Sequence, residues 1–352
     1  MSRRRVGFGV ALVAASVVLA GCQAAPEKGD GGDASAGCVR MVTNSGGLED
    51  RSFNQSSWEG LQQAEEELGV EAEAIVSTSE TDLAPNVEQA VQSGCGLVVT
   101  VGWELADPTL EQAAANPDVA FAIVDESVEA PNVKPVVFDT AQAAYLAGYL
   151  AAGVTRTGVV ATFGGGNQPP VTLFMDGFVD GVAKYNEVHG TSVRALGWDK
   201  ASQDGAFTGD FEDVNKGKTL AEGFIDQGAD VILPVAGQVG EGAAAAALER
   251  DGVSIVWVDS DGYESLPADF RPVILTSVLK NTQDAMVTIV GDVQDDAFTA
   301  DPYVGTLENA GVEIAPYHDL ASLVTPELDG EIEGLRQAII AGEIVVESPS
   351  AP

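Results

Sequence analysis

The sequence predicts an α/β protein built from two doubly wound lobes with parallel sheets. Short apolar runs alternate with helical patterns along most of the chain, for example at residues 97–101 and 231–235. Each run is almost continuously apolar, which is typical of parallel strands that are covered on both faces. Without its N-terminal leader segment the chain still has about 310 residues, which is long for one hydrophobic core, so we expect two lobes.

The N-terminus predicts a lipoprotein signal peptide over residues 1–21. Three arginines at residues 3–5 precede an uncharged apolar stretch, residues 10–20, that is short for a membrane span. The sequence Leu19-Ala20-Gly21-Cys22 then resembles a bacterial lipobox, in which the cysteine thiol receives a diacylglyceryl group. A secretory signal without lipid is the alternative. We expect Cys22 to anchor the protein at the extracytoplasmic face of the cell membrane.

A flexible tether is expected at residues 22–37, which are rich in Gly, Ala and Asp and lack aromatic residues. The folded part should therefore begin near residue 38. The whole chain has a formal net charge of −37. So acidic a protein is not expected to bind nucleic-acid backbones or to dock electrostatically on anionic lipid.

The first folded unit, residues 39–69, predicts a strand, a long polar loop and a helix. The strand ends at a polar, glycine-containing break at residues 44–47. Ser52 followed by Gln55 has the spacing of a capping box, and Gly69 fits a left-handed helix stop. In doubly wound sheets, ligands bind beyond the carboxyl ends of the strands. The loop is therefore a candidate binding site, and a solvated connection is the alternative.

The remaining elements form two series, one for each lobe. In the first series we expect strands at residues 71–76, 97–101, 119–124 and 136–138, and helices at 83–93 and 107–116. In the second series we expect strands at residues 158–163, 193–196, 231–235, 254–258 and 273–278, and helices at 141–154, 171–186, 214–227, 240–251, 282–294 and 325–341.

Two cysteines follow Cys22, and each lies just before a predicted strand. If the strands after Cys38 and Cys95 are neighbours, the two thiols face each other at one edge of the sheet. A disulfide is then plausible outside the cytoplasm, and two buried free thiols are the alternative.

Several polar and aromatic residues follow predicted strands and form a candidate ligand site. Carboxylates and a lysine at strand ends can form hydrogen bonds with sugar hydroxyls, and two phenyl rings can enclose a planar ring. Taken singly, such residues are more often helix caps, turn residues or core aromatics. The candidates are Asn44, Phe53, Asn54, Asp125, Phe211, Gly237, Asp259 and Lys280.

Enzyme classes find little support in the sequence. His189 and His318 are the only histidines, and neither has the spacing of a metal ligand. There is no Gly-x-Ser-x-Gly elbow, and the segment at residues 212–219 lacks the first glycine of a phosphate loop. Asp259 and Asp261 have the residue types of a glycosidase pair, but nothing in the sequence places them at a suitable separation across a cleft.

A set of motifs resembles the basic membrane protein family of lipoproteins, the purine nucleoside receptors of bacterial transporters. The resemblance extends over nearly all of residues 39–320. Its specific pieces lie at residues 46–55 (GGLEDRSFNQ), 58–60, 117–118, 121–125, 164–165, 170–171, 177–178, 216–218, 258–261, 311–312 and 315–316.

The resemblance implies the type I periplasmic-binding-protein fold, with two lobes, a hinge and a ligand cleft between them. We expect the N-terminal lobe to contain residues 38–140 and about 259–279, and the C-terminal lobe residues 141–258 and about 280–345. By resemblance, Phe53 and Phe211 clamp the purine, and Asp125, Asp259 and Lys280 hold the ribose. Family members commonly carry Asp where this chain has Asn44, which puts the base preference in question.

The function implied is the capture of purine nucleosides for an ABC transporter, with permease and ATPase subunits as partners. We expect a monomer that has no catalytic activity, cofactor or metal and that meets the membrane only through its lipid. A ligand sensor or surface protein of the same fold, without a transporter, is the alternative. Because an amide can both donate and accept hydrogen bonds, Asn44 predicts a broader purine tolerance than Asp would give.

Overall fold

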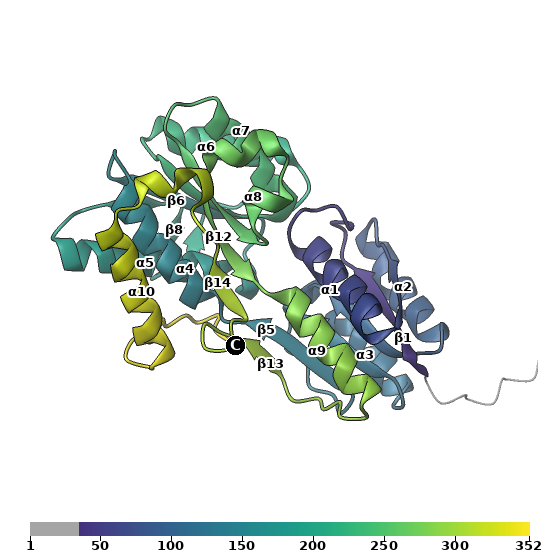
Figure 1. Ribbon diagram of the computed structural model, residues 1–352. Coiled ribbons are helices and arrows are strands. Elements are labelled where there is room, and N and C mark those ends of the chain that lie inside the picture. Colours follow the sequence, from purple (N-terminus) through teal and green to yellow (C-terminus); the bar gives the residue numbers. More distant parts are fainter. Residues whose placement is uncertain (1–34) are drawn as a thin grey trace, which may run out of the picture. The chain divides into compact units, whose positions relative to one another are not determined.

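Two six-stranded sheets form the two lobes of the chain (Figure 1). The computed structural model describes residues 35–352. The predicted signal peptide, Cys22 and most of the predicted tether lie outside the described residues. The first strand, β1, begins at Ser35, so the last three residues of the segment predicted as tether, 35–37, belong to it.

The first sheet is parallel throughout, in the order β13-β5-β4-β3-β1-β2. Alternate strand residues pack on opposite faces, as in Val99 beneath α1 and α9 and Val98 beneath α2 and α3. The strands are β1 (Ser35–Thr43), β2 (Glu71–Ile75), β3 (Cys95–Val101), β4 (Ala120–Val124), β5 (Val133–Phe138) and β13 (Tyr303–Gly305). The helices are α1 (Phe53–Leu68), α2 (Glu80–Gln92), α3 (Ala106–Ala115) and α9 (Thr282–Gln294).

The second sheet has the order β14-β12-β11-β10-β6-β7, and only β14 runs antiparallel to its neighbour. Its strands are β6 (Val159–Gly164), β7 (Arg194–Leu196), β10 (Val231–Val235), β11 (Ser254–Asp259), β12 (Ile274–Lys280) and β14 (Val312–Ile314). Its helices are α4 (Thr140–Val154), α5 (Pro169–His189), α6 (Val214–Asp226), α7 (Gly240–Leu248), α8 (Gly262–Ser265) and α10 (Pro326–Ile340). A small hairpin, β8 (Trp198–Asp199) with β9 (Asp204–Gly205), was not predicted.

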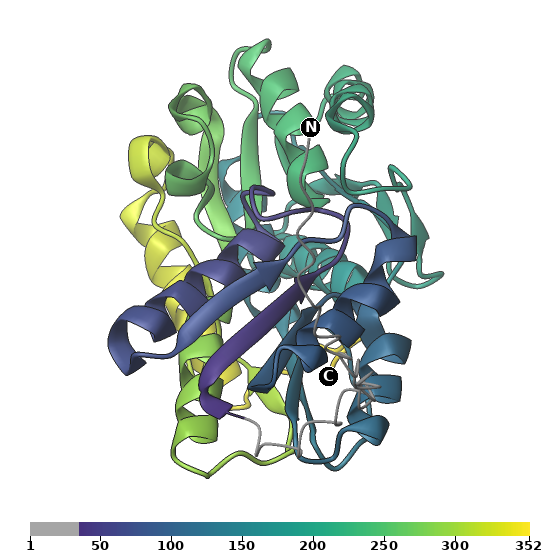
Figure 2. The ribbon, with the colours of Figure 1, turned by 90° about the vertical axis from the view of Figure 1, so that its right-hand side faces the viewer.

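The chain crosses between the lobes three times. After β5 it enters the second lobe, where α4 packs on α5. After β12 it returns to the first lobe, where α9 packs on α1. Between β13 and β14 it crosses to the second lobe again. Figure 2 shows the result from the side, with the purple and blue first lobe below the green second lobe. Each lobe is thus built from separate segments of the chain, as in a type I periplasmic-binding-protein fold.

The predicted domain boundaries were wrong after residue 258. Residues 259–279 were assigned to the first lobe, but β12 pairs with β11 in the second sheet. Residues 282–305 were assigned to the second lobe, but α9 and β13 complete the first. The sequence of a strand does not show which sheet it joins, because that depends on its hydrogen-bond partners.

The two cysteines of the described chain meet at the edge where β1 and β3 begin. These strands are neighbours, and Cys38 and Cys95 form a disulfide whose Cα atoms are 5.0 Å apart. The bond ties the start of the first strand to the next strand in the sheet.

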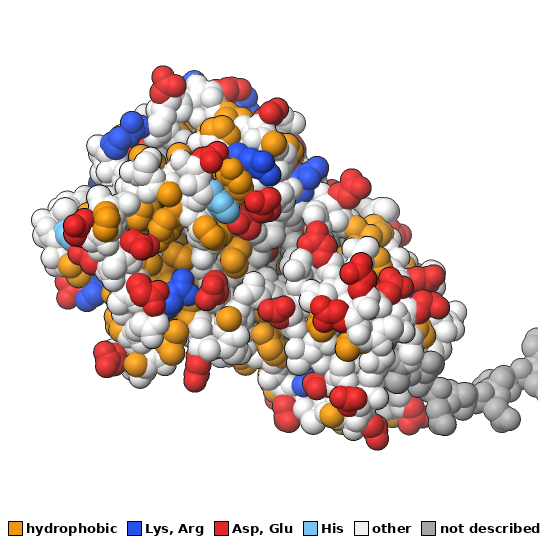
Figure 3. Space-filling model, in the orientation of Figure 1, with side chains coloured by type: hydrophobic (Ala, Val, Ile, Leu, Met, Phe, Trp, Pro, Cys, Tyr) orange, Lys and Arg blue, Asp and Glu red, His pale blue; other side chains and the backbone are white. Residues whose placement is uncertain are grey.

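The visible face of the first lobe carries many acidic side chains and few basic ones (Figure 3). Over residues 35–352, no helix has both the length and the apolar character that crossing a bilayer requires.

Candidate functional site

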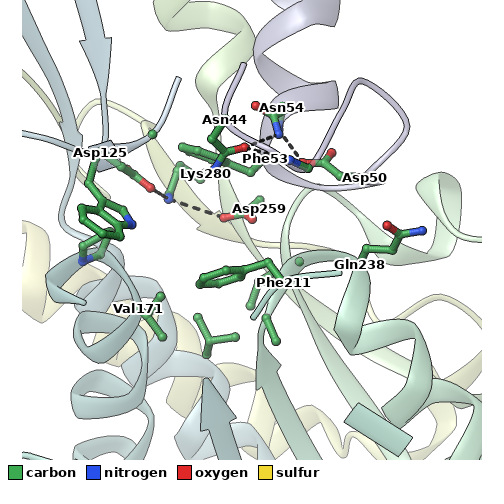
Figure 4. A pocket seen from close by; sticks show the side chains of 18 of the residues that line it. Asn44, Asp50, Phe53, Asn54, Asp125, Val171, Phe211, Gln238, Asp259 and Lys280 are labelled. Atoms are coloured by element: carbon green, nitrogen blue, oxygen red, sulfur yellow. Dashed lines mark hydrogen bonds and ion pairs between the residues drawn. The ribbon is translucent and has the colours of Figure 1, made fainter. Parts of the chain in front are cut away.

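One pocket lies where the carboxyl ends of the strands of both sheets face each other. All eight residues predicted for the ligand site line it. Figure 4 shows Phe211 across the pocket from Asn44 and Asn54, with the side chains of Asp125, Lys280 and Asp259 between these two sides. The remaining lining includes Asp50, Trp103, Glu104, Val171, Phe174 and Gln238.

The loop before α1 is held by Asp50, which the sequence analysis did not single out. Its carboxylate accepts hydrogen bonds from the backbone N–H groups of Ser52 (3.1 Å), Asn54 (2.8 Å) and Gln55 (3.0 Å). Burial raises the pKa of Asp50 to about 6, although these three donors oppose the rise. The acid therefore fills the capping role at the helix N-terminus and holds the loop against the pocket.

The predicted capping box is therefore wrong in its side-chain bonds. Ser52 occupies the N-cap position, but its side chain makes no capping hydrogen bond. Gln55 accepts from the backbone of Arg51 (3.2 Å) instead of from Ser52. Asp50 already binds the free N–H groups, so the Ser52 hydroxyl is left to act elsewhere. It donates to the carboxylate of Asp259 in the other lobe.

Lys280 lies between two carboxylates at the centre of the pocket. Its Nζ is 2.6 Å from Asp125 Oδ2 and 3.5 Å from Asp259 Oδ1, and its side chain is only 3% exposed. Burial, the largest single influence, would lower the pKa of Lys280, but the two carboxylates together outweigh it and raise the pKa. The lysine therefore stays charged, and the two lobes share one buried cation.

The two aspartates hold corresponding positions in the two lobes. Asp125 directly follows β4 and Asp259 ends β11, and both have a left-handed backbone, with φ of 63° and 66°. This conformation is uncommon for residues other than glycine, although Asp tolerates it better than most. The turn directs each carboxylate out of its sheet and toward the pocket, a form of strain that often accompanies binding sites.

Aromatic rings supply the apolar surface of the pocket. Phe53 and Phe174 face Lys280, whose Nζ lies 5.1 Å and 5.4 Å from their ring centroids. The ring of Phe211 rests on the backbone of Gly165, where a Cβ would come within 2.3 Å of ring carbon Cε1. Glycine at this position therefore fixes how deep the Phe211 ring can lie.

The predicted role of Asn44 needs correction in one respect. We expected its side-chain amide to offer a ligand both a donor and an acceptor. In the structure, Asn44 Oδ1 accepts from Asn54 Nδ2 (2.8 Å) and from the backbone of Gly46 (3.3 Å). The oxygen is thus engaged within the protein, and the side-chain amide donates toward the neighbouring carboxylate of Glu104.

Arg51 joins the two lobes beside the pocket. Its guanidinium donates to the backbone oxygen of Ser265 (3.1 Å) and lies 3.4 Å from Glu241. Its own carbonyl accepts from the hydroxyl of Ser260 (2.8 Å) and from the indole of Trp257 (3.4 Å). These contacts connect the loop before α1 with the second lobe.

Other groups considered from the sequence lie apart from this pocket. The carboxylate of Asp261 accepts from the backbone of Tyr263 (3.1 Å) and lies 2.7 Å from His318 Nε2, so it forms no glycosidase pair with Asp259 across a cleft. Within the part of the chain that the structure describes, no cluster of His, Cys, Asp and Glu is arranged to hold a metal ion.

Comparison with known proteins identifies the family. The profile of the Bmp family, described as "ABC transporter substrate-binding protein PnrA-like", matches residues 38–350. The chain belongs to this family. The predicted resemblance is thereby confirmed, and the protein is a solute-binding protein of an ABC transporter rather than an enzyme.

Relatives in the family match over almost their full length. The "ABC transporter nucleoside-binding protein BmpA" of Lactococcus lactis subsp. cremoris is 31% identical, covering 99% of this chain and 100% of that protein. The "CD4+ T-cell-stimulating antigen" of Listeria innocua is 30% identical, covering 98% and 99%. The Bmp protein therefore has full-length relatives in at least two bacterial genera.

Solved structures confirm the predicted fold class. The crystal structure of an ABC transporter solute-binding protein from Aeropyrum pernix K1 aligns with a TM-score of 0.78 and 25% identity, covering 88% of this chain and 92% of that one. A glucose-galactose binding protein from Geobacillus stearothermophilus aligns with a TM-score of 0.58 at 16% identity, covering 80% and 98%, and shows likeness of fold alone.

Proposed function

We propose that this Bmp protein binds purine nucleosides and delivers them to its transporter. The observation that carries the proposal is that Phe53 and Phe211, from opposite lobes, line one pocket together with the Asp125–Lys280–Asp259 group. Two phenyl rings suit a planar base, because offset stacking is favourable for flat rings. Carboxylates beside the rings suit ribose hydroxyls, which can donate hydrogen bonds to them.

The charge of the pocket supports a neutral ligand rather than a nucleotide. The acidic side chains of Asp50, Glu104, Asp125 and Asp259 line it, and Lys280 is the one cationic side chain among its described lining residues. A phosphate group would meet uncompensated carboxylates in a site of low dielectric constant, where repulsion is strong. A nucleoside brings several O–H and N–H donors and no charge.

The relatives support the same ligand class. The Lactococcus protein named above is a nucleoside-binding protein by its name, and it matches this chain from end to end.

The second part of the proposal is the anchor: Cys22 carries the lipid that holds the binding protein near its transporter. It rests on the lipobox sequence alone, and replacing Cys22 with Ala should release the protein from the membrane fraction. Unchanged membrane retention of the variant would rule the anchor out.

Calorimetry on the protein, together with mass spectrometry of any ligand that co-purifies, tests the binding proposal. We expect guanosine, inosine or adenosine to bind, and guanosine monophosphate to bind at least tenfold more weakly because of its charge. The free base and free ribose should also bind weakly, since each leaves half of the polar groups unpaired. If no purine nucleoside binds, the proposal is wrong.

A further inference from the structure

Glu104 is a pocket carboxylate that no sequence motif marked. It lies in the short helical turn at Trp103–Leu105, directly after β3, and lines the pocket beside Asn44. Its Oε2 is buried and has no hydrogen-bond partner among the described residues. A buried acceptor without a donor is costly and uncommon. This oxygen can therefore accept a hydrogen bond from a ligand, in addition to the one that the Asn44 side chain gives the carboxylate.

The position of Glu104 is set by the absence of a side chain at Gly102. A Cβ on Gly102 would lie 2.7 Å from Glu104 Oε2 and 3.1 Å from Asn44 Nδ2. The carboxylate and the amide thus converge over the same glycine, whose φ of 115° is itself unfavourable for other residues. Burial raises the pKa of Glu104, and hydrogen bonds from its own backbone and from the Asn44 side chain oppose the rise.

A second unpaired acceptor lies on the other side of Asn44. Asn54 is 1% exposed, and its Nδ2 donates to Asn44 Oδ1, but within residues 35–352 its Oδ1 has no partner. Asn44 contacts both residues, so the two free oxygens belong to one wall of the pocket. A ligand that satisfies both must bring two hydrogen-bond donors to that wall, and the edge of a base can supply them as N–H groups.

We propose that Glu104 and Asn54 determine specificity by accepting hydrogen bonds from a base edge that carries two neighbouring N–H donors. This inference rests on the proposed nucleoside binding and names the base. Guanine has such an edge, formed by N1–H and the 2-amino group. Hypoxanthine offers only N1–H. Adenine presents the N1 lone pair, which faces a carboxylate unfavourably. The expected order of affinity is therefore guanosine, then inosine, then adenosine.

The first test is calorimetry with the three nucleosides on the wild-type protein and on Glu104→Gln. The amide can still accept but also donates and carries no charge. Guanosine should bind roughly 10- to 100-fold more weakly to the variant, because a charged acceptor is lost. Adenosine should bind equally well or better. Glu80→Gln is the matched control, because Glu80 raises the pKa of Glu104 through its charge but does not line the pocket.

The second test changes the ligand and needs no variant. On the wild-type protein, 1-methylguanosine lacks the N1–H and should bind at least tenfold more weakly than guanosine. An unchanged ratio of guanosine to adenosine affinity in Glu104→Gln, or adenosine as the tightest ligand of the wild type, would overturn the inference. Either result leaves nucleoside binding intact, whereas the failure of all three nucleosides would overturn the proposed function as well.

Discussion

The hydroxyl of Ser52, in the first lobe, donates a hydrogen bond to the carboxylate of Asp259, in the second. Asp259 is also 3.5 Å from Lys280, so the contact between lobes and the buried charge group are one network. We therefore expect closure of the lobes and formation of the polar pocket to be coupled, as in hinge closure around a ligand.

Replacing Ser52 with Ala should weaken ligand binding without unfolding α1. Asp50 provides the helix cap, so the loss is confined to the bond with Asp259. A hydrogen bond to a charged group contributes about 1.5–3 kcal/mol, which corresponds to an affinity loss of about tenfold or more. Calorimetry against Ser79→Ala, a partly exposed serine at the N-cap position of α2 and away from the pocket, gives the comparison. Equal affinity in both variants would contradict the coupling.

Replacing Arg51 with Ala should favour the open form modestly. Its guanidinium is partly exposed, and ion pairs of this kind contribute about 0.2–1 kcal/mol. Small-angle scattering with ligand should show a larger radius of gyration at sub-saturating concentration than for the wild type. Arg271→Ala is the matched control, since Arg271 contacts Tyr263 and Glu264 within the second lobe. A shift of the same size in the control would refute the role of Arg51.

Replacing Lys280 with Gln should destabilise the protein strongly. It leaves the carboxylates of Asp125 and Asp259 buried without a cation, and breaking a buried ion pair this way costs about 3–5 kcal/mol. Adding Asp125→Asn to the variant should recover part of the loss. Urea unfolding of the single and double variants measures both effects. Simple additivity of the two single changes would show that the groups are not coupled.

The disulfide between Cys38 and Cys95 should raise stability. It closes a sequence separation of 57 residues, and cross-links of this kind contribute about 2–4 kcal/mol in the chain-entropy view. The variant Cys38→Ala/Cys95→Ala should therefore melt at a lower temperature, and a reducing agent should lower the melting temperature of the wild type alone. Two free thiols in denatured, unreduced protein would show that the bond is absent.

The carboxyl of Asp50 should make stability fall as the pH rises from about 4 to about 6. Its pKa rises from 3.8 to about 6 on folding, so in this window the folded state binds more protons than the unfolded one. The difference corresponds to about 3 kcal/mol between the two ends. Other acids also change the free energy of unfolding with pH. The measurement is therefore a comparison of the wild type with Asp50→Asn by urea unfolding at several pH values, in which the difference between their slopes of unfolding free energy against pH reports Asp50. Parallel slopes would contradict this titration.

The sequence by itself determined the fold class, most element positions and eight residues of the pocket. Apolar runs of strand length indicate parallel strands at any position in the chain. In parallel sheets, the loops that follow the strands lie at the same edge of the sheet. Asp125 and Asp259 were therefore expected at one site although 134 positions separate their numbers. Local pattern suffices for statements of this kind.

Only the tertiary structure decided three further matters. The lobe membership of residues 259–305 depends on the pairing of β12 with β11 and of β13 with β5. The exchange of roles between Ser52 and Asp50 depends on Asp259 arriving from the other lobe. Glu104 stands in a turn without any motif, and it became a pocket acceptor only because Gly102 and Asn44 lie against it. Asp259, β5 and Asn44 are far in sequence from Ser52, β13 and Glu104, so spacing along the chain does not reveal these contacts.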